Sequence, residues 1–235
     1  GRIKCAYPTT ARVVVMIRLN IYLLKRWISR LLSRSHRLSY SLEFVALYFG
    51  KKRHRLVSSE SKLVIEGPAR CGNSSALRLV IENNPELKKR VATHIHKGFQ
   101  VVYADRLNVP CITMLRSPLE SVVSHAGLLS QLDQVRVDSD KQRRRLLKCC
   151  LKDYINFVEC IGKRAIVVGF EAFINNPDSL IDYINARSDL NLSSSRAIKQ
   201  SDLPVHVLPN KDRDAIKTHY REIIRDCANI QRIAD

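Results

Sequence analysis

Hydrophobic residues between positions 62 and 170 fall into short apolar runs, separated by stretches with helical spacing. The runs Lys62–Glu66, Val91–Ile95, Pro110–Leu115 and Ala165–Phe170 are rich in β-branched residues, which is typical of buried strands. Apolar residues recur every three or four positions over 73–81, 99–107, 119–129 and about 141–161, which predicts helices. Strands alternating with helices predict an α/β fold with three layers, in which helices flank a central, mainly parallel sheet.

Residues 1–58 are basic and lack this alternation. Apolar residues recur there at helical spacing, and lysines and arginines fill most of the other faces. The apolar positions are Ile17, Ile21, Leu24, Ile28, Leu31 and Leu32. They predict a basic amphipathic helix that packs on the main domain, with a peripheral membrane or acidic-partner contact through 11–34 as the alternative. We therefore divide the chain into a mostly helical segment, 1–58, and an α/β domain, 59–235.

The composition narrows the class of partner. The chain has 235 residues, with 40 Lys and Arg against 22 Asp and Glu, giving a formal net charge of +18. A hydrophobic fraction of 45% excludes a disordered chain, and this length can bury a full core. The charge indicates an anionic partner, namely nucleic acid, a membrane surface or a small polyanion such as a nucleotide. The aromatic fraction of 6% weighs against single-stranded nucleic acid bound by base stacking.

The cysteines and the N-terminal region bear on the compartment. Seven cysteines, an odd number without a C-x-x-C pair, fit neither a disulfide framework nor a zinc site. We therefore expect a reducing, cytoplasmic environment and no bound metal. The apolar run Val13–Ile17 lies between Arg12 and Arg18, so it is too short to span a bilayer, and no secretory signal is visible. The sequence begins with Gly1 and not with Met, so a membrane anchor upstream of it remains an alternative.

A glycine-containing segment follows the first predicted strand and begins a helix. Gly67–Ser74 matches both glycines and the serine of the pattern G-x-x-x-x-G-K-[ST], but Asn73 takes the lysine position. Such a loop holds an anion with backbone N–H groups at the start of a helix. We expect Arg70, inside the loop, to supply the positive charge that the lysine gives elsewhere.

The third predicted strand leads into a second candidate anion site. Arg116 lies at the carboxyl end of that strand, where open α/β sheets bind ligands, and Pro118 suits the first turn of a helix. Ser124 follows about two helical turns after Arg116. Arg116 and Ser124 can hold one phosphate only if the loop folds back over the helix.

Together these segments resemble the sulfotransferases that use 3′-phosphoadenylyl sulfate (PAPS). The family's first loop reads P-[KR]-[ST]-G-[TN]-[ST], and Ala69–Ser74 is similar. Its second segment reads R-x-P-x-x-x-x-x-S, which matches Arg116 to Ser124, and Val168–Glu171 with Asn176–Asp178 is similar to its third. The resemblance covers about residues 62–191. Cys71 departs from the usual Ser or Thr, and the family's R-K-G triplet is missing, so Lys211 or Arg213 is a candidate substitute.

The resemblance implies transfer of a sulfuryl group from PAPS to a hydroxyl or amine, with adenosine 3′,5′-bisphosphate (PAP) as product and no metal. Arg116 and Ser124 would hold the 3′-phosphate, and Arg70 would also stabilise charge on the leaving phosphate. The phosphosulfate would be held by Arg70 and the backbone amides of Cys71, Gly72, Asn73, Ser74 and Ser75.

Sulfuryl transfer needs a base for the acceptor proton. His94 and His96 alternate in the second predicted strand, so both side chains should share one face at the carboxyl edge of the sheet. The resemblance to a family K-T-H segment favours His94, with His96 as the alternate and Lys97 in place of the lysine. We expect Glu171 to cap a helix and Lys141–Arg145 to form a solvated face. The histidines expected to be only structural or solvated are His36, His54, His125, His206 and His219.

Two other functions remain as alternatives. A divergent P-loop kinase would bind ATP with Mg²⁺, and Asn73 at the lysine position argues against it. A non-catalytic basic module would bind nucleic acid or an anionic membrane through charge alone. A nucleotide donor makes nucleic acid the less favoured partner, and the positive charge that the donor site does not explain points to an acidic acceptor or an anionic surface. The sequence leaves open the acceptor and the oligomeric state.

Overall fold

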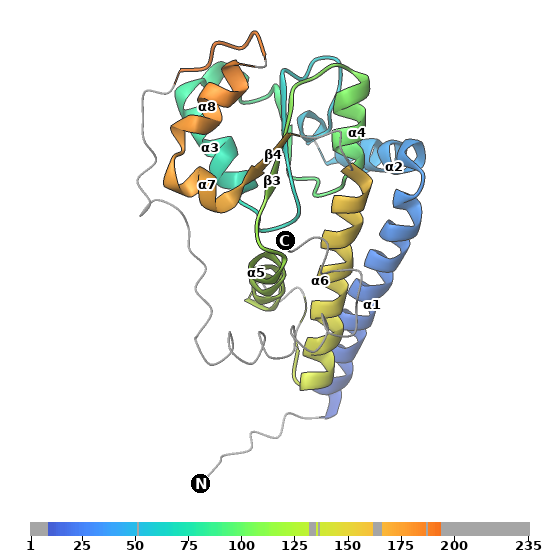
Figure 1. Ribbon diagram of the computed structural model, residues 1–235. Coiled ribbons are helices and arrows are strands. Elements are labelled where there is room, and N and C mark those ends of the chain that lie inside the picture. The colour runs from blue at the N-terminus through green and yellow to red at the C-terminus, as the bar shows by residue number, and fades with distance from the viewer. Residues whose placement is uncertain are drawn as a thin grey trace.

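The computed structural model describes residues 9–50, 52–131, 135, 137–161, 166–186 and 188–193. Its sheet consists of four parallel strands in the order β2-β1-β3-β4 (Figure 1). The strands are β1 (Leu63–Glu66), β2 (Val91–Thr93), β3 (Cys111–Leu115) and β4 (Ile166–Gly169). The predicted α/β fold with a parallel sheet is confirmed, and all four strands lie within the predicted runs.

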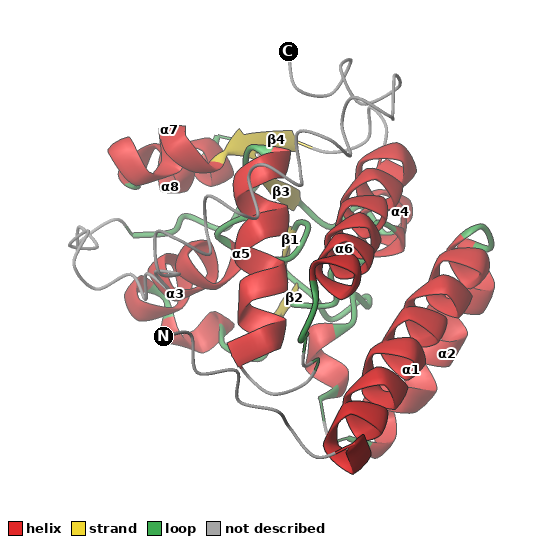
Figure 2. Ribbon diagram, turned by 90° about the horizontal axis from the view of Figure 1, so that it is seen from below, coloured by secondary structure: helices red, strands yellow, loops and turns green. Residues whose placement is uncertain are grey.

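Eight α-helices accompany the sheet within the described ranges. They are α1 (Thr9–Ser33), α2 (His36–Phe49), α3 (Asn73–Asn83), α4 (Phe99–Arg106), α5 (Pro118–Gln131), α6 (Asp140–Ile161), α7 (Phe170–Asn175) and α8 (Asp178–Asn185). Short 3₁₀ turns occupy Arg53–Arg55 and Pro85–Leu87. Helices α3, α7 and α8 lie on one side of the sheet and α4 and α6 on the other, with α5 between the two groups when the molecule is seen from below (Figures 1 and 2). The four helices predicted between residues 73 and 161 are confirmed within a few residues at each end.

The central strand β1 has no solvent-facing side. Leu63, Val64, Ile65 and Glu66 are all fully buried. Helices cover both faces of a parallel sheet, which explains why this strand is a continuous apolar run instead of an alternating one. β4 lies at the sheet edge, and there Val167 is about half exposed. The loop that follows β1 therefore has the ends of β2 and β3 on its two sides.

The N-terminal helix α1 packs on α6, so the expected contact with the main domain is confirmed. Leu19 is buried in the main core, and Tyr22 and Leu23 pack against that core. The predicted apolar stripe, however, lies on another face of α1 and is exposed: Ile21, for example, retains 48% of its surface. The division between 1–58 and 59–235 stays a prediction. None of the helices in the described ranges is long and apolar enough to cross a bilayer.

Candidate anion and nucleotide site

The loop after β1 owes its shape to two glycines. Gly72, the residue before α3, has a φ of 92°, and a Cβ atom there would lie 2.5 Å from Cδ2 of Phe170. A Cβ atom on Gly67 would lie 2.3 Å from the carbonyl oxygen of Met114 in β3. No side chain fits at either position, so the sequence pattern with two glycines reflects close packing of the loop against β3 and the start of α7.

Backbone N–H groups at the start of α3 are available to an anion. The first bond within the helix runs from the N–H of Ala76 to the carbonyl oxygen of Gly72, at 2.9 Å. The N–H groups of Asn73, Ser74 and Ser75 therefore have no acceptor within the helix. Their partial positive charge adds to that of the helix dipole. This is the feature that the loop pattern predicted.

The side chain of Cys71 does not belong to this surface. Cys71 is fully buried, and its thiol donates to the hydroxyl oxygen of Ser121 at 3.4 Å, while Ser121 donates to the carbonyl oxygen of Ala69 at 2.7 Å. Burial raises the pKa of the Cys71 thiol to about 11. Any contribution of Cys71 to ligand binding comes from its backbone, as the sequence predicted.

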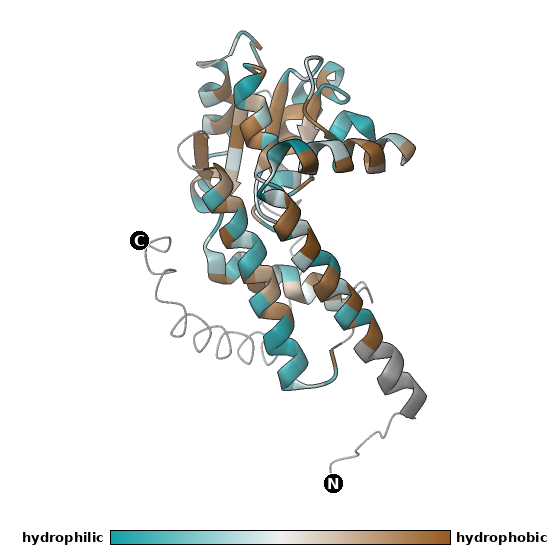
Figure 3. Cartoon of the chain, turned by 90° about the vertical axis from the view of Figure 1, so that its right-hand side faces the viewer, coloured by the Kyte–Doolittle hydropathy of each residue, from teal (hydrophilic) through white to brown (hydrophobic). Residues whose placement is uncertain are grey.

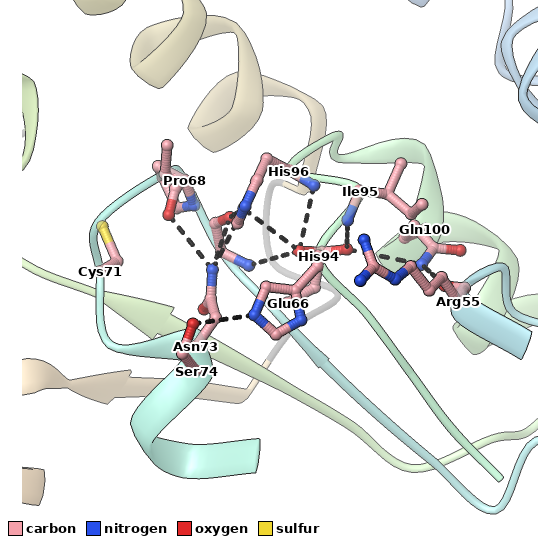
Figure 4. A network of polar contacts seen from close by, with 12 residues as sticks. Arg55, Glu66, Pro68, Cys71, Asn73, Ser74, His94, Ile95, His96 and Gln100 are labelled. Atoms are coloured by element: carbon pink, nitrogen blue, oxygen red, sulfur yellow. Dashed lines mark hydrogen bonds and ion pairs between the residues drawn. The ribbon is translucent and has the colours of Figure 1, made fainter. Parts of the chain in front are cut away.

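Asn73, which stands at the lysine position of the P-loop pattern, holds the loop together. Its Nδ2 donates to the carbonyl oxygens of Gly67 and Pro68, at 3.1 and 3.3 Å, and the side chain is buried (Figure 4). A P-loop lysine instead extends along the loop to the terminal phosphates of a nucleotide. Asn73 is thus occupied with the backbone and cannot take that role.

Arg70 joins the loop to α5. Its backbone has a φ of 67°, and its Nε donates to the hydroxyl oxygen of Ser124 at 2.9 Å. Burial and, secondarily, the positive charge of Arg116 lower the pKa of Arg70. The structure therefore brings together Arg70, Arg116 and Ser124, the three side chains predicted to contact the donor.

Arg116 is held from several sides. Its guanidinium lies over the ring of Phe170, 4.7 Å from the ring centroid, and its Nη2 is 3.6 Å from a carboxylate oxygen of Glu120. The phenol of Tyr154 in α6 donates to the carbonyl oxygen of Arg116 at 2.8 Å. The Nε atom of Arg116 is buried without a hydrogen-bond partner among the described residues. An arginine fixed in this way presents charge at the end of β3 at a small cost in side-chain entropy.

The reasoning that placed His94 and His96 on one face of a strand is wrong. β2 ends at Thr93, and the two histidines have φ values of 63° and 56°, which no strand residue adopts. The turn nevertheless directs both rings at the loop after β1. His94 Nε2 lies 2.9 Å from the hydroxyl oxygen of Ser74, and the ring centroids of the two histidines are 5.9 Å apart (Figure 4). Left-handed backbone at non-glycine residues is costly, and such strain is concentrated at functional sites.

Glu66, at the end of β1, fixes this turn. Its buried carboxylate accepts hydrogen bonds from the N–H groups of Ile95, His96 and Gly67, at 3.0, 3.1 and 3.3 Å. Burial raises the pKa of Glu66, and the nearby His96 and these N–H donors oppose the rise. Sequence reasoning missed Glu66, because a single acidic residue after an apolar run gives no sign that two neighbouring loops will surround it.

Nδ1 of His96 has three polar neighbours. It is 2.9 Å from the carbonyl oxygen of Gly67, 3.6 Å from a carboxylate oxygen of Glu66 and 3.3 Å from Nδ2 of Asn73. A proton on Nδ1 would be donated to the Gly67 oxygen in the shorter contact and would leave a lone pair on Nε2, whereas the longer contact from the Asn73 amide favours the other tautomer. Among the described residues, no hydrogen-bond partner is recorded for Nε2 of His96. In the tautomer with the proton on Nδ1, this nitrogen can accept a proton.

His94 has a different electrostatic setting. Burial, with smaller effects of His96 and Arg55, lowers the pKa of His94 to about 4. The imidazole of His94 is therefore neutral at pH 7, and it is a weak base. Its bond to Ser74 places it against the first turn of α3, where the backbone N–H groups are free of helical bonds.

A cavity of about 240 Å³ lies beside His96. It is lined by Tyr22, Arg26, Pro68, Ala69, Ile95, His96, Ser121, Val122, His125, Leu129, Cys150, Asp153 and Tyr154. Helix α1 supplies two of these side chains, so the N-terminal segment forms part of the wall. The cavity adjoins the phosphate loop and is the candidate pocket for a second substrate.

His125 lies in the wall of this cavity. The sequence predicted only a structural or solvated role for it, and that role stays a prediction. Burial, followed by the charges of Arg26, His96 and Arg70, lowers the pKa of His125 to about 3. One histidine within a helix carries no motif, so only the packing of α6 against both α5 and α1 reveals its position.

The remaining predicted residues lie as follows. Lys97 forms an ion pair with Glu43 in α2, and its role in place of the family lysine stays a prediction. Glu171 lies in the first turn of α7, as predicted, although Gly169 is the N-cap residue. In α6, Arg145 donates to Asn20 of α1 at 3.1 Å. Lys211, Arg213, His206 and His219 lie outside the described residues. No group of His, Cys, Asp and Glu within the described ranges could hold a metal ion.

Comparison with known proteins gives no match: no family model, no curated protein and no solved structure is similar to this chain.

Proposed function

We propose that this chain is a PAPS-dependent sulfotransferase, with a P-loop-like phosphosulfate site in a three-layer α/β domain. The observation that carries the proposal is the proximity of two positively charged side chains, Arg70 and Arg116. Two guanidiniums of like charge are held near one another beside a helix N-terminus, and no carboxylate contacts Arg70 among the described residues. An anionic ligand between them would remove the repulsion.

The contacts around the loop favour this donor over ATP. The side chain of Asn73 is bound to the loop backbone, so the residue at the P-loop lysine position cannot reach the terminal phosphates of ATP. A sulfuryl group carries less charge than a γ-phosphoryl group and needs no Mg²⁺, so a guanidinium and backbone N–H groups suffice for its transfer. The N–H groups of Asn73, Ser74 and Ser75 would hold the phosphosulfate, and Arg116 and Ser124 would hold the 3′-phosphate.

The acceptor would enter the cavity beside His96. Its hydroxyl or amine attacks sulfur in line, and the bond between sulfur and the 5′-phosphate oxygen breaks as the new bond forms. The electron pair goes to that phosphate oxygen, where Arg70 stabilises the charge, and PAP leaves. The acceptor proton goes to Nε2 of His96, whose ring Glu66 and Gly67 orient. His94 is the alternative base; its low pKa and its bond to Ser74 suit a role beside the donor better.

Ligand-induced thermal stabilisation tests this proposal without knowledge of the acceptor. PAP without metal should raise the unfolding temperature, and Arg70→Ala and Arg116→Ala should remove the effect. Arg78→Ala is the control. This substitution removes the same charge from the exposed side of α3, where Arg78 pairs with Glu82. No stabilisation by PAP well above micromolar concentration would contradict the proposal. Stabilisation by ATP that requires Mg²⁺ would favour a kinase. Stabilisation by duplex DNA would favour a basic binding module.

A further inference from the structure

Helix α1 exposes its apolar face. Ile17, Ile21, Leu24, Ile28 and Leu31 follow one another at intervals of four and three residues, so they form one stripe along the helix. Each retains between 40 and 55% of its surface. At a rise of 1.5 Å per residue, the stripe is about 21 Å long. Trp27, beside the stripe, is 53% exposed.

The face of α1 that packs on α6 carries charges. Arg26 Nε is 2.7 Å and Arg30 Nη1 is 2.6 Å from the two carboxylate oxygens of Asp153. These side chains are largely shielded from solvent, with 28% of Arg26 and 20% of Arg30 exposed. A surface helix usually turns its apolar side inward and its charges to water. In α1 the inner face carries both Leu19, Tyr22 and Leu23 and the arginines that pair with Asp153, and the second apolar stripe is left on the outer side.

Helix α2 adds a second exposed stripe. Leu38, Leu42, Val45 and Phe49 again follow intervals of four and three residues, and Phe49 retains 81% of its surface. Helices α1 and α2 lie along one flank of the molecule, beyond α6 and α4 (Figures 1 and 3). Exposed apolar stripes on two helices that contact each other are typical of a binding surface.

The charge of this flank is positive. The sequence contains no acidic residue before Glu43, and Glu43 pairs with Lys97. Lys25, Arg34 and Arg37 are exposed on or beside the two helices. Apolar stripes next to exposed cations therefore characterise the α1–α2 flank, which consists of residues 17–49.

We propose that the α1–α2 flank binds an anionic lipid surface. The apolar stripes would enter the interface between headgroups and acyl chains, with Trp27 at that level and the cations against the headgroups. Nucleic acid would satisfy the cations but leave the stripes in water. A second copy of the chain would bring a flank of the same positive charge against the first, which opposes pairing. The proposal is independent of the sulfotransferase proposal.

The test uses Trp27, because it is the only tryptophan of the chain and lies in the flank. The whole protein is added to vesicles of phosphatidylcholine alone or of phosphatidylcholine with phosphatidylserine. We expect sedimentation with the phosphatidylserine vesicles, a blue shift of the tryptophan emission, and a reversal of both by high salt. Neutral vesicles should bind the protein much more weakly.

Matched variants assign the effect to the flank. The triple variant Ile21→Gln, Leu24→Gln, Ile28→Gln changes only exposed side chains and should weaken vesicle binding more than tenfold. Lys25→Gln should weaken it about fivefold. The double variant Leu107→Gln, Val167→Gln is the control, because these side chains are 40 and 51% exposed and lie outside the flank. It should bind vesicles like the natural chain.

Three results would overturn the proposal. The first is no binding to vesicles of either composition. The second is vesicle binding that does not shift the tryptophan emission and is equally strong in the triple variant. That result would assign vesicle binding to another surface. The third is a concentration-dependent dimer in sedimentation velocity that the triple variant abolishes, without vesicle binding; the occupant would then be a second copy. The variants are compared only when their circular dichroism spectra match that of the natural chain.

Discussion

The guanidinium of Arg70 donates a hydrogen bond to the hydroxyl oxygen of Ser124, with 2.9 Å between Nε and Oγ. The two residues are 54 positions apart, so this bond connects the phosphate loop directly to α5. Ser124 lies about two helical turns from Arg116, and Arg70 nevertheless brings it into contact with the loop. In the proposed donor site, Arg70 would be shared between Ser124 and the ligand.

Arg70→Ala should weaken PAP binding by about tenfold to a hundredfold. A hydrogen bond to a charged group contributes about 1.5–3 kcal/mol, and each 1.4 kcal/mol is a factor of ten in affinity. Titration calorimetry without metal measures the effect, and Arg78→Ala should leave the affinity unchanged. Arg70→Lys should give an intermediate affinity, because it keeps the charge and loses the planar donor geometry. Equal affinities of Arg70→Ala and the natural chain would remove Arg70 from the site.

Gly72→Ala should lower the free energy of unfolding by about 1–3 kcal/mol. The new methyl group would lie 2.5 Å from the ring of Phe170, and the φ of 92° is strained for any residue with a Cβ atom. Gly169→Ala is a matched control, because a Cβ atom there meets nothing within 4 Å and its φ is −67°. Urea denaturation compares the two. A loss in Gly169→Ala as large as in Gly72→Ala would refute this account of the loop.

His125 should make the protein sensitive to acid. Its pKa is about 3 in the folded chain and about 6.5 in an unfolded one, so the unfolded state binds an extra proton between these values. The free energy of unfolding therefore falls as the pH falls below about 6.5. At pH 4.5 this loss is on the order of 2 kcal/mol. Urea denaturation from pH 7 to pH 4 measures it.

The variant His125→Gln isolates this contribution. It should lose less stability on acidification than the natural chain, even if its stability at pH 7 is lower, because glutamine does not titrate. His54→Gln changes an exposed histidine and should retain the full acid dependence. His94 titrates in the same direction in all three proteins, so it cancels in the comparison. Parallel curves for His125→Gln and the natural chain would mean that His125 is protonated in the folded state.

Asp153→Ala should destabilise the protein by about 2–4 kcal/mol. It removes the partner of both Arg26 and Arg30 and leaves two mostly shielded guanidiniums unpaired. Thermal unfolding measures the loss. Asp140→Ala is the control, since 73% of the Asp140 side chain is exposed and its ion pair with Arg143, at 3.7 Å, lies at the surface. A loss no larger than that of Asp140→Ala would show that apolar contacts alone hold α1.

The two histidines should separate in their effects on binding and turnover. His96→Gln should abolish sulfuryl transfer from PAPS to any acceptor found in a panel of hydroxyls and amines, and leave PAP affinity unchanged. His94→Gln should weaken PAP binding, because it removes the partner of Ser74. Sulfate transfer from labelled PAPS and calorimetry with PAP give the two measurements. Unimpaired transfer by His96→Gln would return the role of base to His94.

Local patterns predicted the strands and helices well, because each element is an apolar run of the length and period that its geometry requires. The family resemblance predicted that Arg70, Arg116 and Ser124 all contact the donor, and the structure joins Arg70 to Ser124. What the local patterns missed depends on contacts between distant segments. Nothing near Glu66 in the chain indicates that it accepts bonds from residues 95 and 96. Alternation suggested a longer second strand, but the turn that these bonds impose ends it at Thr93.

The orientation of α1 was beyond a reading of periodicity. The apolar stripe predicted the helix correctly, but a stripe does not tell whether it faces a core or another partner. Asp153, more than 120 residues away, attracts Arg26 and Arg30 to the inner side. The same packing completes the cavity with Tyr22 and Arg26 and encloses His125.

The position of β1 in the middle of the sheet has a consequence for synthesis of the chain. The loop after β1 appears early, but the groups that shape it come from the turn after β2, from α5 after β3 and from Phe170 after β4. A chain that ended at residue 100 would contain Gly67, Gly72, His94 and His96. It would still lack Arg116, the second arginine beside Arg70. Affinity for the proposed nucleotide would thus arise late, after β4 has joined the sheet, and a ribosome-bound chain would lack the complete site for most of its synthesis.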